Sequence, residues 1–323
     1  MSNKAKRIIP LIRLTAFTSH IAANLLCYFL LLFFTPISWA QQPSDLPVDL
    51  YIYTFNSIDE DERLKAIESL QKIGEPAIPA LVKALQNEDI WVRSLAAITI
   101  ARIKRNTEVS IPALVQLLKD KQPLVRYSAA LALRYIGGTK ATFATPILIQ
   151  ALQDKSPSVR RRAILALRNI GKPKTTIPLF IKALGDTDES VRYSAASSLN
   201  GIASTNIPTF KKIVPSSSNI SFLIKALQDK QELVRYIATF TLNYIGRSKR
   251  ASATPTLVKA LQDESPLVRQ SAAFALSNTK KTDSTVSALI KALKDDDYAV
   301  RNSAAYALNR MGVAERMLRQ LDE

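Results

Sequence analysis

The chain has 323 residues, a formal net charge of +17 and a hydrophobic content of 47%. This apolar content is enough to bury a core, and the basic excess favours acidic partners such as an anionic protein, a membrane surface or a polyanion. A single cysteine, Cys27, excludes a disulfide within the chain.

The first forty residues have the three-part layout of a secretory signal peptide. Basic residues and no acids begin the segment, residues 21–34 form an apolar run, and Pro36 ends it ahead of Ser38-Trp39-Ala40. The run is shorter than the roughly 20 residues of a spanning helix. We therefore expect residues 1–40 to be removed and the protein to be exported to the periplasm or secreted; an uncleaved N-terminal anchor is the alternative.

Cleavage after Ala40 would remove the only histidine, His20, together with Cys27. The mature chain would then lack the usual general base at neutral pH, the commonest zinc ligands and the Ser-His and Cys-His nucleophile pairs. It would keep 40 basic against 27 acidic residues, a net charge of +13. The sequence thus predicts no catalytic residue, no metal site and no cofactor, and it argues against an enzyme.

Residues 41–56 predict a lead-in with a partial capping helix, and residues 57–312 predict an array of repeats. A Val-Arg pair recurs every 32 to 34 residues, with one longer interval of 43. In all but the first repeat an Asp stands six residues before the Arg, and in most repeats a Pro stands eight residues before that position. The Arg residues are Arg93, Arg126, Arg160, Arg192, Arg235, Arg269 and Arg301.

Each repeat is predicted to be a pair of helices, as residues 145–171 illustrate. A Pro at 146 suits a first helix turn, and Ser156 before Pro157 suits the N-cap of a second helix. An apolar stripe of helical period follows at Val159, Ala163, Ala166, Leu167 and Ile170. Glycines 137, 171 and 246 are predicted to close second helices in a left-handed conformation.

A single helix pair cannot bury such a stripe, whereas stacked pairs can, so we expect an all-α, right-handed α-solenoid of about eight units. The Pro, Asp and Arg at these offsets resemble the HEAT repeat. The short repeat is most similar to the HEAT-like repeats of phycobilin lyases (PBS lyases), and the resemblance covers roughly residues 55–312.

The repeated acid and base are interpreted as a structural ladder, because a catalytic pair is normally needed only once. We expect each Arg to bond the Asp of its own or of a neighbouring repeat, and each Asp to cap the second helix. The ladder residues are Asp120, Arg126, Asp154, Arg160, Asp186, Arg192, Asp229, Arg235, Asp263, Arg269, Asp295 and Arg301.

Two segments depart from the repeat. The long interval contains residues 206–221, which predict a surface loop, or an extra half-turn with a loop. This insertion either contacts a partner or is tolerated without a function. Residues 313–323 predict a C-terminal cap helix. The connections between repeats are basic, and a solenoid would gather them into one ridge; its residues are Lys104, Arg105, Lys140, Lys172, Lys174, Arg247, Lys249, Arg250, Lys280 and Lys281.

Binding residues are expected on the second helices, which line the concave face in HEAT-like stacks. The positions two and nine residues after the Val lie opposite the apolar stripe and hold Tyr and Arg, the types that dominate interface hot spots. The residues expected to bind a partner are Tyr127, Arg134, Arg161, Arg162, Arg168, Tyr193, Asn200, Tyr236 and Asn243.

The leading hypothesis is therefore a non-enzymatic, exported scaffold or adaptor that holds a protein partner, preferably an acidic one, on this face. The resemblance implies a second hypothesis, a lyase-like subunit that handles a chromophore. A third is binding of a polyanion or membrane surface through the basic ridge. Nucleic acid is a poor fit, because export would separate the protein from it.

Overall fold

The computed structural model describes residues 47–103, 107–137, 139–214, 220–245 and 250–313. Within these ranges the chain is all-α, with no strand. The first helices and single helices are α2 (Val48–Tyr53), α4 (Ile78–Ala84), α6 (Ile111–Leu117), α8 (Thr145–Ala151), α10 (Pro173–Ala183), α12 (Ile207–Ile213), α13 (Ile220–Ala226), α16 (Thr254–Ala260) and α18 (Asp283–Ala292). The second helices are α3 (Glu60–Ile73), α5 (Ile90–Ile103), α7 (Pro123–Ile136), α9 (Pro157–Ile170), α11 (Glu189–Thr205), α14 (Glu232–Leu242), α17 (Pro266–Leu276) and α19 (Tyr298–Arg310).

Short 3₁₀ helices precede several of the first helices. They are η3 (Glu75–Ala77), η4 (Thr107–Ser110), η5 (Thr139–Ala144) and η7 (Ala251–Ala253), whereas η2 (Thr54–Asn56) lies between α2 and α3. The expected N-terminal capping helix is α2, followed by η2. The six residues before Pro47 and the C-terminal cap helix expected after Val313 lie outside the described residues.

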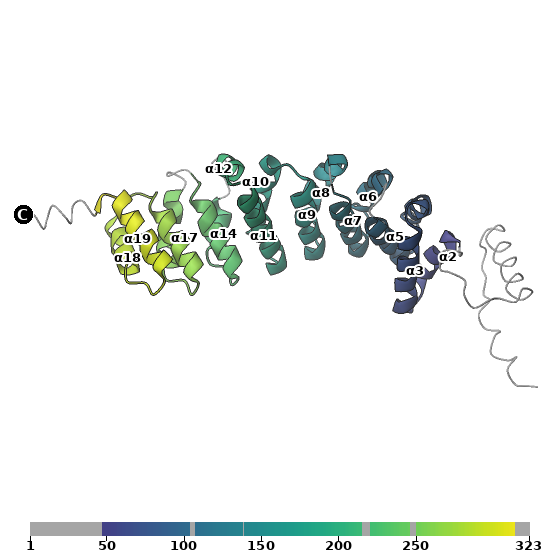
Figure 1. Ribbon diagram of the computed structural model, residues 1–323, viewed down its shortest axis with the longest axis horizontal. Helices are drawn as coiled ribbons and strands as arrows, with labels where there is room; N and C mark the ends of the chain where they lie inside the picture. Colours follow the sequence, from purple (N-terminus) through teal and green to yellow (C-terminus); the bar gives the residue numbers. More distant parts are fainter. Residues whose placement is uncertain (1–46, 104–106, 138, 215–219, 246–249, 314–323) are drawn as a thin grey trace, which may run out of the picture. The chain divides into compact units, whose positions relative to one another are not determined.

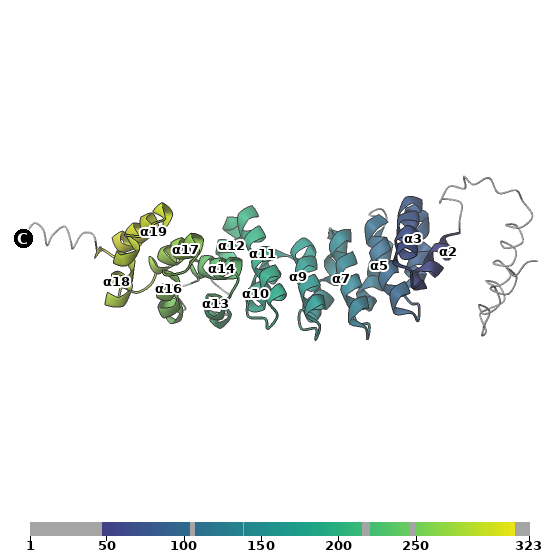
Figure 2. The ribbon, with the colours of Figure 1, turned by 90° about the horizontal axis from the view of Figure 1, so that it is seen from below.

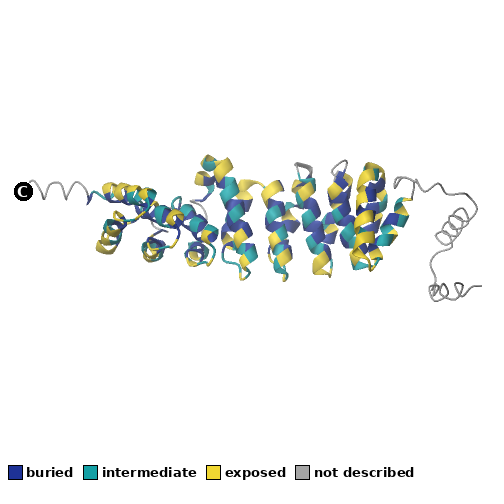
Figure 3. Ribbon diagram, turned by 60° about the horizontal axis from the view of Figure 1, so that its bottom comes forward, coloured by how far each residue is buried: buried dark blue, intermediate teal, exposed yellow. Residues whose placement is uncertain are grey.

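The helix pairs stack in chain order, and each second helix packs against the second helix of the next pair (Figures 1 and 2). The apolar stripe of α9 is buried along its whole length, from Val159 to Ile170. Figure 3 shows helices with buried residues on one side and exposed residues on the other. The small alanines of the stripe let neighbouring helices approach closely, so the core runs continuously through the stack.

Two details of the helix ends differ from the prediction. Gly137 has the expected positive φ of 58°, but Gly171 is extended at φ −80°. A glycine is needed at position 171 because there is no room for a side chain. A Cβ there would lie 2.4 Å from Cγ2 of Thr176 and 2.6 Å from the carbonyl oxygen of Leu167. Gly246 lies outside the described residues.

The capping of the second helices also differs. Ser156 occupies the N-cap position of α9 but makes no side-chain cap hydrogen bond. The ladder carboxylate of Asp154 accepts the N–H of Ser156 itself at 2.8 Å, one position before the helix. Other aspartates do cap: Asp188 accepts the N–H groups of Ser190 and Val191 at the start of α11. The ladder Asp stands too far before the second helix to accept the first N–H groups of that helix, and its carboxylate oxygens also accept hydrogen bonds from an Arg.

The insertion is not a surface loop, because it contains the two-turn helix α12. Asn206 caps this helix by accepting the N–H of Thr209 at 3.0 Å. Phe210 is fully buried, with its ring centroid 5.8 Å from that of Phe240 and 6.1 Å from that of Tyr244. Residues 215–219 lie outside the described part of the chain. The helix is held in place because one aromatic side chain enters the core between α11 and α14.

Candidate functional site

The Asp-Arg ladder connects neighbouring repeats. Of the two pairings that the sequence left open, the structure has the one between repeats. Nε of Arg126 donates to Oδ2 of Asp154 at 2.6 Å, and Nη2 donates to Oδ1 at 2.7 Å. The same pairing joins Arg93 to Asp120, Arg160 to Asp186, Arg192 to Asp229, Arg235 to Asp263, and Arg269 to Asp295.

Each ladder Arg also reaches back into its own repeat. Nη1 of Arg126 donates to the carbonyl oxygen of Asp120 at 2.8 Å and to that of Lys121 at 3.0 Å. The guanidinium thus fastens the turn before its own helix while its other edge holds the next repeat. Arg301 makes the contacts to its own turn through the carbonyl oxygens of Asp295 and Asp296.

The charges of the ladder stabilise one another. Burial alone would raise the pKa of Asp154, but the hydrogen bonds from Arg126 and the Ser156 N–H, with the charges of Arg126 and Arg160, bring this pKa below its ordinary value. The hydrogen bond from Arg269 is the largest cause of the lowered pKa of Asp295. These carboxylates are ionised and doubly engaged at neutral pH, which suits a structural role rather than proton transfer.

The second helices present a separate polar surface, which we call the second-helix face. It comprises the residues two, six and nine positions after each Val of the repeat, which share one side of a helix. Arg161 and Tyr193 lie at the first of these positions on α9 and α11, and both are exposed; Tyr193 retains 49% of its accessible area. No carboxylate among the described residues pairs with Arg161 or Arg168.

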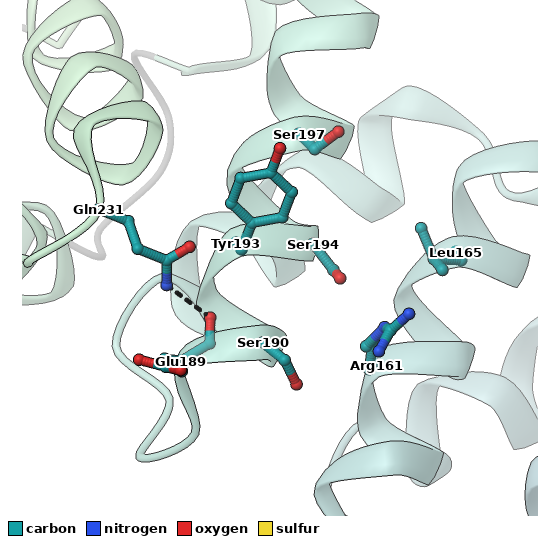
Figure 4. Close-up of a pocket in the computed structure, with 8 residues that line it drawn as sticks. All are labelled: Arg161, Leu165, Glu189, Ser190, Tyr193, Ser194, Ser197 and Gln231. Carbon is teal, nitrogen blue, oxygen red and sulfur yellow. Dashed lines mark hydrogen bonds between the residues drawn. The ribbon is translucent and has the colours of Figure 1, made fainter.

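A hollow of about 480 Å³ lies on this face between α9 and α11. Figure 4 shows Arg161 and Leu165 on α9 across from Ser190, Ser194 and Tyr193 on α11. Gln231, before α14, also lines the hollow and donates from Nε2 to the carbonyl oxygen of Glu189 at 2.9 Å (Figure 4). The hollow combines a free cation, an aromatic ring and serine hydroxyls, a set that suits recognition of a polar or acidic group.

Some of the predicted binding residues contact one another instead of standing free. The guanidinium carbon of Arg162 lies 4.6 Å from the ring centroid of Tyr127, and Nη2 donates to the Tyr127 hydroxyl. The pair therefore joins α7 to α9, and both side chains are half-buried. Tyr127 and Arg162, which were both predicted to bind a partner, therefore form a contact between repeats.

The remaining basic residues of the face lie along α7 and α9. Arg134 is half-buried with its guanidinium carbon 5.5 Å from the ring centroid of Tyr135. Arg168 is exposed and extends over α11, where a Cβ on Gly201 would come within 2.7 Å of Nη2 of Arg168. The glycine leaves room for the guanidinium between the two helices. Asn200, beside it on α11, is half-buried.

Sequence reasoning missed an aromatic group on the C-terminal repeats. Tyr236 was predicted, but Phe240, Phe274 and Tyr306 stand six residues after the Val of α14, α17 and α19 and were not. The rings of Phe274 and Tyr306 stack with centroids 5.3 Å apart. The signal was available, because the sixth position lies on the same side of the helix as the second and the ninth.

This aromatic group borders a second hollow, of about 210 Å³, between α14 and α17. Tyr236, Phe240, Phe274 and Asn243 all line it. Oδ1 of Asn243 is buried and accepts no hydrogen bond from the described residues. Oγ of Ser271, which also lines the hollow, is likewise buried without a hydrogen-bond partner among the described residues. The hollow therefore combines aromatic walls with two unsatisfied polar atoms.

The predicted basic ridge is only partly present. Lys172, Lys174 and Lys280 are exposed, and Lys281 is half-exposed. Arg250 instead is buried. It donates to the carbonyl oxygen of Leu242, the last residue of α14, to those of Asn243 and Ile245 just beyond it, and to that of Asn278 after α17. Its charge is used to cap helix ends, where cations are favoured. Lys104, Arg105, Arg247, Lys249 and the side chain of Lys140 lie outside what the structure describes.

The described part of the chain contains no cluster of three or more His, Cys, Asp or Glu side chains placed to hold a metal ion. Within the same residues, none of the helices combines the length and the apolar character that crossing a membrane requires.

Stacked helix pairs joined by an inter-repeat ladder define an α-solenoid protein. A family model for HEAT repeats matches residues 50–134, 145–219 and 220–309, and a model for the PBS lyase HEAT-like repeat matches residues 125–154. The chain belongs to the HEAT-repeat family, which confirms both the predicted fold class and the resemblance. The search of the curated proteins found no match.

Several solved structures are similar to this chain. An engineered protein is 26% identical with a TM-score of 0.56, over 82% of this chain and 78% of the other. The YibA protein of Escherichia coli is 20% identical with a TM-score of 0.53, over 93% and 99%, which shows the fold alone. The complex of CpcE and CpcF of phycocyanin lyase from Nostoc sp. PCC7120 is 21% identical over 47% and 96%, and its TM-score of 0.43 supports nothing further.

Proposed function

We propose that the protein is a non-enzymatic scaffold that binds a protein partner on its second-helix face. The observation that carries the proposal is the hollow between α9 and α11, where Arg161 and Tyr193 are exposed and Arg161 has no carboxylate partner within the described residues. Tyr and Arg side chains contribute most to interface hot spots, because each combines a large contact area with polar groups. Of the nine residues predicted from the sequence, Arg161, Arg168 and Tyr193 are exposed, whereas Tyr127 and Arg162 pair with each other.

The partner's binding surface is expected to be acidic. Neither α7 nor α9 contains an Asp or Glu, and Arg161 and Arg168 on α9 have no carboxylate partner among the described residues. Glu189 at the edge of the hollow is the nearest exception on α11. An arginine fork binds a carboxylate through two parallel hydrogen bonds, which gives both affinity and orientation.

A capture experiment tests the proposal. The purified chain is used as bait in periplasmic and membrane extracts, at low and at high salt, beside a variant with Arg161→Ala, Arg168→Ala and Tyr193→Ala. We expect one dominant protein that the wild type retains at high salt and the variant loses. The matched control is Lys182→Ala, which removes an exposed cation on the first helix α10. This variant should capture the partner normally.

Two results would contradict the scaffold. Equal capture by the triple variant would show that the partner binds elsewhere. Capture that disappears with salt and contains no dominant protein would favour the polyanion hypothesis and the exposed lysines between repeats, because polyanion binding falls steeply as salt rises.

Export is the second part of the proposal and rests on the sequence of residues 1–40 alone, which lie outside the described residues. Cell fractionation followed by intact-mass measurement of the recovered protein tests it. We expect a periplasmic or secreted chain that begins at Gln41. A chain that keeps Met1, or one found in the cytoplasm, would overturn this part of the proposal.

A chromophore-handling role is the second candidate, favoured by the match of residues 125–154 to the PBS lyase HEAT-like repeat. This match covers a single helix-turn-helix segment of a longer array, and a shared fold does not imply a shared activity. Mixing the purified chain with a bilin and recording its visible absorbance tests this candidate. An unchanged spectrum would exclude it, whereas a stable spectral shift would displace the scaffold as the leading function.

A further inference from the structure

The second-helix face is divided into two chemically distinct halves. On α7 and α9 it carries Arg134, Arg161 and Arg168. On α14, α17 and α19 the same side of the helices carries Tyr236, Phe240, Phe274 and Tyr306, the last three at the sixth position after the Val. Helix α11 lies between the halves and presents Tyr193 and serine side chains. Because the positions correspond repeat by repeat, both halves lie on one continuous side of the stack.

The aromatic half is built to receive apolar groups. Phe274 and Tyr306 retain 38% and 42% of their accessible area although they stack on each other. Phe274 lines the hollow together with the rings of Tyr236, Phe240 and Tyr244, and Tyr306 extends this aromatic group on α19. A contiguous group of partly exposed rings marks an interaction surface, whereas isolated surface rings do not. Lys211 and Arg310 lie nearby, but each is already placed over a ring, at 5.4 Å from Tyr244 and 5.9 Å from Tyr306.

Two buried atoms that line the hollow of this half, Oδ1 of Asn243 and Oγ of Ser271, lack a hydrogen-bond partner among the described residues. Oδ1 of Asn243 is buried, and no described residue donates to it. A buried acceptor without a donor is costly, so a backbone N–H of a bound segment would improve its environment. Asn243 lines the same hollow as Phe240 and Phe274.

We infer that the partner binds through one segment with two parts: an acidic part that lies on α7 to α11, and an apolar or aromatic part that enters the hollow between α14 and α17. This inference rests on the proposed function and specifies its partner. Neighbouring helices are roughly 8–10 Å apart, so α9 and α14 are about 20 Å apart across α11. An extended chain covers that distance with about six residues, at roughly 3.3 Å each.

Synthetic peptides test the inference without knowledge of the natural partner. The probe is a fluorescent peptide with a Glu-rich block, a Gly-Ser spacer of about six residues and a Phe-rich block, made in both block orders because the chain direction is open. Two matched peptides replace Glu by Gln or Phe by Ser. We expect the wild-type chain to bind one block order about tenfold more tightly than either matched peptide.

Variants of the protein then locate each block. Arg161→Glu with Arg168→Glu should weaken the complete peptide about tenfold and remove its advantage over the Gln peptide. Phe240→Ala with Phe274→Ala should likewise weaken binding of the complete peptide about tenfold and remove its advantage over the Ser peptide. Circular dichroism confirms that each variant is folded. Lys182→Glu and Phe143→Ala change one basic and one aromatic side chain at exposed positions away from this face and should leave binding unchanged.

The outcomes separate the inference from the proposed function. If the wild-type chain does not distinguish the complete peptide from its matched versions, the two-part inference is wrong. If only the arginine variant weakens peptide binding, the inference also fails, but the hypothesis of an acidic partner on the second-helix face still stands. The proposed function fails separately, if the partner captured from extracts ignores the Arg161, Arg168 and Tyr193 substitutions.

Discussion

At each rung of the ladder a single arginine side chain serves two neighbouring repeats. Arg126 holds the carbonyl oxygen of Asp120 in its own repeat and the carboxylate of Asp154 in the next. Both side chains of the pair are largely covered, with 14% and 11% of their area exposed. A charge in this position has lost much of its hydration, so removing its partner costs more than the pair itself contributes.

Asp154→Asn should therefore lower the free energy of unfolding by about 2 kcal/mol, because it leaves the half-buried Arg126 without a counter-charge. Urea unfolding followed by circular dichroism measures this effect. Glu88→Gln, which removes an exposed carboxylate in the turn before α5, is the matched control and should change stability little. Equal stability of Asp154→Asn and wild type would mean that the ladder does not hold the repeats together.

The ladder also predicts how stability depends on pH. The pKa values of Asp154 and Asp295 are lowered by folding, so the folded chain binds their protons less tightly than the unfolded chain. Their contribution is therefore complete above the ordinary aspartate pKa and is lost as the pH falls through the lower folded values. Between about pH 6 and about pH 3, wild type should lose more stability than Asp154→Asn. Parallel pH profiles would contradict this assignment.

At the scale of elements, α12 is the feature that the repeat does not explain. It follows α11 directly and contacts both α10 and α11, while Phe210 reaches Phe240 and Tyr244 of the neighbouring pair. The same Phe240 lines the aromatic hollow of the second-helix face. The insertion therefore packs, through Phe210, against the ring of Phe240 that forms one wall of that hollow.

Phe210→Ala should lower the free energy of unfolding by about 3 kcal/mol or more, since it empties a fully buried ring site. It should also expose α12 to limited proteolysis between residues 206 and 214. Phe143→Ala removes a ring that is 54% exposed in η5 and serves as the control. If both variants unfold at the same urea concentration as wild type, α12 does not depend on Phe210.

For the whole molecule, the sequence was sufficient for what repeats and insufficient for what occurs once. The helix pairs and the contact of Arg with Asp follow from a spacing that recurs, because each repeat must match its neighbour. The spacing did not decide whether the Asp belongs to the same repeat or to the next one. Phe210 and Arg250 belong to no repeated position. Their burial depends on contacts between α12 and α14, and between the ends of α14 and α17, which single-sequence patterns do not encode.

The second-helix face was predicted incompletely for a related reason. The second and ninth positions after each Val were chosen, which found Arg161, Arg168 and Tyr193 but missed Phe240 and Phe274 at the sixth. Two of the predicted residues, Tyr127 and Arg162, pair across neighbouring helices. A sequence pattern gives the side of a helix, whereas the distance to the next helix decides which side chains stay free.

The measurement that tests the central claim most directly is site-specific photo-cross-linking. A photoreactive amino acid replaces Tyr193 on the second-helix face in one chain, and Lys182 on α10 in another, and each is illuminated in cells that produce the protein. The account predicts one discrete cross-linked partner from position 193 and none from position 182. The same products from both positions, or a product from position 182 alone, would contradict binding on the second-helix face.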